Sequence, residues 1–165
     1  MPVLQRMTTA WLETEDRLRL TGECTDGTLV CLWLTRRLSD RLLPLLLDWL
    51  DGHAHDDVHA SLMQEFAQEA ARGALAPQAA VPADAGDTVL VQAVTVARGT
   101  HAIGLTFRAS EAPEDARSWE VTMEQQPLRQ WLAIIHDQYR KAEWPLDLWP
   151  AWIAVTTAQP TAALH

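Results

Sequence analysis

Apolar residues follow two kinds of pattern along this chain, and the stretch from Leu29 to Leu50 contains both of them. Residues 29–34 form an unbroken apolar run, which is typical of a strand that is buried on both faces. After Thr35 the apolar residues recur at helical spacing, which predicts an amphipathic helix. Its expected buried stripe contains Leu38, Leu42, Leu45, Leu46 and Trp49. No other window joins a fully apolar strand to such a helix, so we take this stretch as the folding centre.

Pro44 interrupts the pattern of this helix, because proline lacks a backbone N–H and clashes with the preceding turn. Two interpretations remain open. Either the regular helix begins near residues 39–40, which places Pro44 close to its first turn, or the helix kinks at Pro44. Gly52 is the predicted C-terminal stop.

A β-hairpin is predicted ahead of this stretch. Residues 17–21 alternate between polar and apolar side chains, and the pair at 26–27, Asp-Gly, is typical of a two-residue turn. This turn places Cys24 opposite Leu29 and Cys31 opposite Gly22. Both thiols then lie on one face of the sheet, diagonal to each other and about 7 Å apart at the backbone, which is poor disulfide geometry. We therefore predict two buried, reduced cysteines.

A second helix is predicted from about residue 56 to Arg72, with Asp56 or Asp57 as its N-cap and Gly73 at its end. Its expected inward face contains Val58, Leu62, Phe66 and Ala70. Residues 74–87 are rich in alanine and proline, and we predict a mobile linker there.

Three strands and a closing helix are predicted after the linker. The strands cover residues 88–97, residues 101–108 and a third segment around residues 119–123. The inward side chains of the last two strands are expected to be Ile103, Leu105, Phe107, Trp119, Val121 and Met123. The helix begins with Pro127 at its first position and ends by Pro145. Its expected buried residues are Leu128, Trp131, Leu132, Ile135, Tyr139 and Ala142.

The predicted fold class is therefore α+β: an antiparallel sheet or small sandwich with an inserted helix–turn–helix and a closing C-terminal helix. A length of 165 residues fits one domain, which we expect over residues 1–155, with a disordered tail at 156–165.

The acidic balance of the chain bears on its partners. A net charge of −9 and a pI near 5.0 argue against general binding to nucleic acid or to anionic membranes, because both depend on basic surface. The N-terminal residues contain no apolar run long enough for a signal peptide, and no window reaches the roughly 18 apolar residues of a membrane span. Twelve arginines against one lysine, with abundant alanine, indicate a GC-rich genome, and we expect a bacterial source. We expect a cytoplasmic protein whose partner is another protein or a second copy of itself.

Three stretches carry a resemblance in the order of their elements. They are TDGTLVCLWLT running into a helix, VLVQAVTVARGTHAIGLTFRAS, and SWEVTME followed by the helix from Gln126. This order resembles the head domain shared by the eukaryotic DNA end-joining scaffold proteins and the centriolar cartwheel protein. The resemblance spans most of residues 15–143 and implies a small β-sandwich that clasps a helix–turn–helix, with a non-enzymatic role. In that superfamily the last helix extends into a dimerising coiled coil, whereas Pro145 and Pro150 interrupt it here.

One cluster of ligand-type residues lies at the joint between the first two helices. Its predicted metal ligands are His53, His55, Asp57 and His59. Imidazoles and carboxylates at this density suit zinc or another divalent metal, and no other cofactor is indicated. The spacing is similar to the HxHxDH box of the metallo-β-lactamase superfamily, but the last histidine comes one position late. The alternative interpretation is that these are solvated capping residues of a turn.

Two further groups are candidates for partner binding. Arg36, Arg37 and Arg41 gather at the start of the first helix, where cations oppose the helix dipole. They either pair with carboxylates of this chain or form a docking point for an acidic partner or a phosphate. The C-terminal group is Trp144, Trp149 and Trp152. Tryptophan is common at interfaces, so this tail either covers the open face of its own sheet or contacts a partner or a second copy.

No pattern in the chain matches a phosphate loop or a nucleophile elbow. The predicted function is therefore a non-enzymatic protein–protein interaction module: an adaptor, an accessory subunit or a chaperone-like binder. The alternative is a metal-binding protein or metal-dependent enzyme that uses the cluster from His53 to His59.

Overall fold

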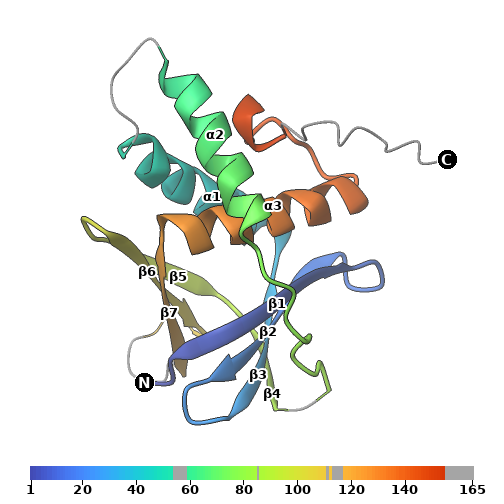
Figure 1. Cartoon of the computed structure of the whole chain (residues 1–165). Coiled ribbons are helices and arrows are strands. Elements are labelled where there is room, and N and C mark those ends of the chain that lie inside the picture. Colours follow the sequence, from blue (N-terminus) through green and yellow to red (C-terminus); the bar gives the residue numbers. More distant parts are fainter. Residues whose placement is uncertain (54–58, 85, 111, 113–116, 155–165) are drawn as a thin grey trace, which may run out of the picture.

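The computed structural model describes residues 1–53, 59–84, 86–110, 112 and 117–154. In this part of the chain the strands form two sheets, and the helices lie together beyond one end of them (Figure 1). The predicted α+β class with a closing C-terminal helix is confirmed. No described helix is both long enough and apolar enough to cross a membrane.

The first sheet contains four strands in the order β1 (Leu4–Leu12), β2 (Arg17–Cys24), β3 (Leu29–Leu34) and β4 (Asp87–Leu90). The first three strands are antiparallel, whereas β4 runs parallel to β3. Parallel pairing requires a long crossover connection, and the helices inserted between β3 and β4 provide it.

The second sheet contains β5 (Ala93–Arg98), β6 (Ala102–Arg108) and β7 (Ser118–Glu124), which are all antiparallel. Alternate side chains of β6 and β7 point into the core, as predicted. The buried residues are Ile103, Leu105, Phe107, Trp119, Val121 and Met123.

The two sheets are joined at both edges. The strand expected over residues 88–97 is two strands, because the chain changes sheet at Val91 and Gln92. The Val91 N–H donates to a carbonyl of β3, whereas the Gln92 N–H donates to a carbonyl of β6, each at 2.9 Å. At the opposite edge, Val3 forms a parallel bridge with Glu120 of β7. The result is a small sandwich in which both joins are made by backbone hydrogen bonds.

The β2–β3 hairpin differs from the prediction by one residue of register. Cys24 and Thr28 close a three-residue loop, with the Cys24 N–H donating to the Thr28 carbonyl at 2.8 Å and Gly27 at a φ of +84°. Cys31 therefore lies opposite Thr21, and the predicted two-residue turn and its register were wrong. A shift of one residue moves every side chain of β3 to the other face, so the two cysteines lie on opposite faces of the sheet. Both are buried and free, as predicted.

The first helix, α1 (Arg36–Asp51), is continuous and contains Pro44 in its interior. The side-chain oxygen of Thr35 accepts a backbone N–H of the first turn at 3.2 Å, which caps the helix. Of the two interpretations left open, the start near residues 39–40 was therefore wrong, and Pro44 lies inside the helix. Leu45 is exposed rather than buried. The buried residues of α1 are Ser39, Leu42, Leu43, Leu46, Leu47, Trp49 and Leu50.

The last long helix, α3 (Gln125–Lys141), packs against β1, β7, the second helix α2 (Ala60–Gly73) and the short 3-10 helix η1 (Ala151–Ile153). It starts two residues before Pro127, which still lies in the first turn, where its missing N–H is not needed. The predicted inward residues are confirmed. Buried are Leu128, Trp131, Leu132, Ile135 and Tyr139, with Ala142 half-buried against the core.

The segment that follows α2 crosses the outer face of the first sheet (Figure 1). Val81 is buried there: its N–H donates to Thr8 Oγ1 at 3.0 Å, and its carbonyl accepts from Thr21 Oγ1 at 3.3 Å. These contacts cover the strand face that carries Thr21. The predicted mobility of residues 74–87 stays a prediction.

Gly86 and Gly73 provide a matched test of the start of β4. Gly86 has a φ of +95°, and a Cβ there would lie 1.9 Å from the Leu29 carbonyl oxygen, whereas a Cβ at Gly73 meets no atom within 4 Å. We expect Gly86→Ala to lower the free energy of unfolding by about 2–3 kcal/mol. Gly73→Ala should leave it unchanged or raise it by up to about 1 kcal/mol. Urea unfolding measures both, and equal effects of the two substitutions would contradict this account of the β3–β4 junction.

Candidate interaction surface on helix α2

Helix α2 turns its large apolar side chains toward solvent. Leu62, Met63 and Phe66 are 45%, 60% and 56% exposed. Their spacing of one and four residues places them on one stripe of the helix, and we call these three residues the apolar face of α2. The predicted inward orientation of Leu62, Phe66 and Ala70 was therefore wrong, since Ala70 is exposed as well. The predicted inward Val58 and the predicted caps, Asp56 and Asp57, lie outside the described residues.

The opposite side of α2 faces the protein and is polar. Gln64 and Gln68 are only 4% and 1% exposed, and Ala71 completes the buried side. Gln64 Nε2 donates to the Leu50 carbonyl at 3.3 Å and to Asp51 Oδ1 at 3.0 Å, both at the end of α1. Two amides at a spacing of four residues thus occupy the stripe that a typical amphipathic helix fills with leucine.

Arg129 of α3 lies at the centre of this polar contact. It is buried, its Nη2 donates to Gln64 Oε1, and its carbonyl accepts from Gln68 Nε2 at 3.0 Å. Its guanidinium also lies 5.2 Å from the centre of the Trp152 ring, within cation–π range. Burial lowers the pKa of Arg129, and the nearby Asp51 carboxylate opposes this by raising it.

Two more hydrogen bonds fasten the C-terminal half of α2. Gln130 Nε2 of α3 donates to the Ala71 carbonyl at 2.9 Å, and Arg72 Nη2 donates to the Ile153 carbonyl of η1 at 2.7 Å. The surface on which α2 rests therefore presents polar groups, which are costly to bury without partners. Glutamine can supply these partners and leucine cannot, so the polar side of α2 turns inward and the apolar side turns outward.

Four residues of this surface and its support were not predicted from the sequence: Met63, Gln64, Gln68 and Arg129. Nothing local marks them, because a helical pattern shows which residues share a stripe but not which stripe meets another helix. The only signal was the pair of glutamines on the stripe opposite Phe66, and solvated glutamines are ordinary on a helix surface.

The predicted metal cluster is only partly described. His55 and Asp57 lie outside the described residues, and His59 precedes α2 at its exposed start. His53 Nδ1 lies 2.7 Å from the Trp49 carbonyl oxygen and Nε2 lies 2.6 Å from the Thr100 carbonyl oxygen. His53 would have to release one of these contacts to bind a metal. Within the described ranges, no three His, Cys, Asp or Glu side chains are grouped as metal ligands, and metal binding by the cluster stays a prediction.

The predicted basic group lies on the surface at the start of α1. Arg36, Arg37 and Arg41 line an open depression together with two carboxylates. Arg36 pairs with Asp40 at 3.4 Å, and Asp40 also accepts from the Tyr139 hydroxyl at 2.7 Å. Neighbouring carboxylates thus offset part of the positive charge, which weakens the depression as a phosphate site.

The predicted C-terminal group is buried in its own chain. All three tryptophans, Trp144, Trp149 and Trp152, are buried in the core, and each has a ring contact with a residue of α3. Trp144 and Trp149 meet the Tyr139 ring edge-on, at centroid distances of 4.9 Å and 5.4 Å. Trp144 Nε1 also donates to Asp16 Oδ1 at 2.9 Å. Partner binding by these three residues stays a prediction, and the structure buries the side chains that would make it.

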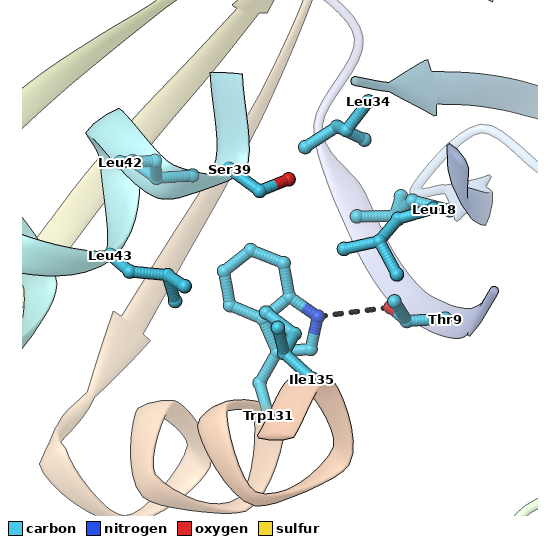
Figure 2. A pocket seen from close by; sticks show the side chains of 9 residues that line it. Thr9, Leu18, Leu34, Ser39, Leu42, Leu43, Trp131 and Ile135 are labelled. Carbon is cyan, nitrogen blue, oxygen red and sulfur yellow. Dashed lines mark hydrogen bonds between the residues drawn. The ribbon is translucent and has the colours of Figure 1, made fainter. Parts of the chain in front are cut away.

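A small cavity lies between the first sheet and helices α1 and α3, and Figure 2 shows its lining. The Trp131 indole projects into this region from α3, and its Nε1 donates to Thr9 Oγ1 at 3.0 Å. Most of the lining is leucine, and the volume of about 10 Å³ is close to that of a single water position. This is a packing defect in the core rather than a substrate site.

Comparisons with protein-family models, with curated proteins and with solved structures found no match to this chain.

Two substitutions on α2 test its orientation. Phe66→Ser removes an exposed side chain and should change the free energy of unfolding by no more than about 0.5 kcal/mol. Gln64→Leu keeps the size of a buried side chain but leaves Arg129 without its acceptor, which should cost about 1–3 kcal/mol. Chemical denaturation ranks the two variants. A larger loss of stability in Phe66→Ser than in Gln64→Leu would mean that the apolar face of α2 is turned inward.

The pH dependence of stability tests the two contacts of His53. Hydrogen bonds to the Trp49 and Thr100 carbonyls favour the doubly protonated ring and raise the pKa of His53 above its ordinary value of 6.5. A raised folded-state pKa contributes stability that is fully present below pH 6.5 and is lost as pH rises through the folded-state pKa. The stability difference between the wild type and His53→Phe, which keeps a ring beside Trp49, should therefore shrink on going from pH 6 to pH 8. An NMR titration that gives His53 a pKa of 6.5 or below would contradict this.

Proposed function

We propose that this chain is a non-enzymatic protein–protein interaction module that binds its partner through the apolar face of α2. The observation that carries the proposal is the exposure of Leu62, Met63 and Phe66 together on one stripe, while the opposite stripe is held by hydrogen bonds. Contiguous exposed apolar groups with a polar surround are typical of docking sites. Phenylalanine supplies a large contact area, and methionine adapts its shape to a partner.

The way in which α2 is held supports this role. Gln64, Gln68 and Arg72 connect the helix to α1, α3 and η1. A partner would therefore meet a helix that is already ordered, and the entropy cost of binding would be reduced. These hydrogen bonds can form in only one rotation of α2 about its own axis. They therefore also keep the apolar face of α2 exposed.

Two further observations favour the same role. The order of elements expected from the sequence resembles that of the scaffold head domains, and this resemblance implies the same non-enzymatic role. The acidic residue Glu65 borders the apolar face, so a partner surface with apolar and basic groups would complement it. An adaptor, an accessory subunit and a chaperone-like binder all fit these features.

Photo-crosslinking in cells tests the proposal. A benzophenone side chain replaces Phe66 in one variant and Ser61 in another, because Ser61 is exposed on the same helix but away from the apolar face. We expect one dominant crosslinked protein from position 66 and none from position 61. Purified partner should then bind Phe66→Ser at least about ten-fold more weakly than the wild type, the size of an interface hot spot.

The result that would contradict the proposal is an equal crosslinking pattern from positions 66 and 61, together with unchanged partner affinity of Phe66→Ser. A crosslink to a second copy of this chain would support the interaction role and identify the partner.

A further inference from the structure

The middle of strand β1 has a free backbone edge. β1 pairs with β2 on one side only, with Trp11 opposite Leu18. The Trp11 N–H donates to Gln138 Oε1 of α3 at 2.9 Å, so it points away from β2. Residues two apart in an antiparallel strand point their N–H and C=O groups to the same side. Thr9 and Met7 therefore also direct their backbone groups away from β2.

These groups have no partner among the described residues. Alternation gives Met7 and Thr9 two N–H donors and two carbonyl acceptors on the free edge. A side chain of α3 occupies this edge at Trp11, and Val3 joins β7 near its other end. The open part of the edge thus has defined limits at both ends.

The free edge lies at the floor of a groove with two walls. Trp131 Nε1 donates to Thr9 Oγ1 at 3.0 Å, which places α3 on the side where Thr9 points. The Val81 N–H donates to Thr8 Oγ1 at 3.0 Å, which places the segment after α2 on the opposite side. Residues 74–80 form one wall, and Gln126, Gln130, Trp131 and Ile134 form the other. The groove has an open volume of about 540 Å³.

We propose that this groove binds an extended segment of a partner protein, which adds to the first sheet as a strand beside β1. Strand addition satisfies the free backbone groups of an edge directly, and specificity then comes from alternate side chains of the added strand. The proposal concerns a different surface from the apolar face of α2 and does not depend on it.

The two walls of the groove favour an extended peptide over a second copy of this chain as its occupant. Pairing two β1 edges would require each sheet to enter the groove of the other, where residues 74–80 and α3 stand on both sides of the edge. A single extended segment has no such obstacle. It is therefore the occupant that fits.

The lining also limits the sequence of the segment. Arg6 is the one charged side chain among the described lining residues, and it is paired with Glu23. Side chains directed toward α3 would meet Met7, Trp131 and Ile134 beside two glutamines, so they should be apolar or uncharged. Side chains directed toward residues 74–80 would meet alanine, proline and glutamine, so they should be small or uncharged.

Peptides selected from a phage-displayed library of random twelve-residue sequences serve as the probe. Fluorescence anisotropy then compares the wild type with Met7→Pro and Met7→Leu. Proline removes the N–H that faces the groove without removing a bond to β2, whereas leucine keeps that N–H and a similar side chain. We expect Met7→Pro to bind at least about ten-fold more weakly and Met7→Leu to bind like the wild type. Equal binding by both variants would overturn the proposal.

Two measurements on the wild-type chain keep the test decisive if Met7→Pro fails to fold. In an added strand, every second N–H of the peptide points toward β1 and the others point away from it. N-methylation of the first set should abolish binding, whereas N-methylation of the second set should leave it unchanged. Equal effects of the two sets would overturn the proposal. In the free protein, the amides of Met7 and Thr9 should exchange with solvent faster than those of Thr8 and Ala10, and peptide should protect them. Protection without peptide, with a dimer seen by light scattering, would also overturn it and identify a second copy as the occupant.

Discussion

The buried guanidinium of Arg129 is the constraint on which the arrangement of the helices depends. A charged group in that position must be hydrogen-bonded, and Gln64 of α2 accepts from it while Gln68 bonds to its backbone carbonyl. This requirement turns the glutamine stripe of α2 toward α3 and leaves the apolar face outside. The same guanidinium lies over Trp152, so it also connects the C-terminal tail to the helices. The hydrogen bonds that α2 makes to this buried arginine thus leave the apolar face exposed, although Nη1 of Arg129 has no hydrogen-bond partner among the described residues.

Backbone hydrogen bonds join the two sheets at two places, and in the described part of the chain one strand edge, that of β1, stays partly unpaired. The bend at Val91 and Gln92 joins them on one side, and the bridge from Val3 to Glu120 joins them on the other. α3 fills the remaining gap between β1 and β7, but its side chain Gln138 reaches the edge of β1 only at Trp11. A helix cannot pair with a strand along its length, so part of the edge keeps unpaired backbone groups. Closing the sandwich with a helix therefore creates the groove beside β1.

Several features follow from local pattern and were predictable. Alternation along β6 and β7 identified the core residues from Ile103 to Met123, and helical spacing identified those of α3. The apolar run of β3 and the leucine-rich helix after it also form, and most of their large apolar side chains are buried, although Leu45 is exposed. The two free cysteines follow as well, although not through the expected register. Local chemistry is sufficient for these features because each depends on residues close in the chain.

The remaining features depend on residues that are distant in the chain. The stripe of α2 that turns inward depends on Arg129, 65 positions beyond Gln64. Both ring nitrogens of His53 are engaged because α1 ends beside the carbonyl of Thr100. The hairpin register follows from a three-residue loop closed by Cys24 and Thr28, which pattern alone does not distinguish from a shorter turn. A periodic pattern states which side chains share a face, and only packing against distant partners decides which face is buried and which is left for another molecule.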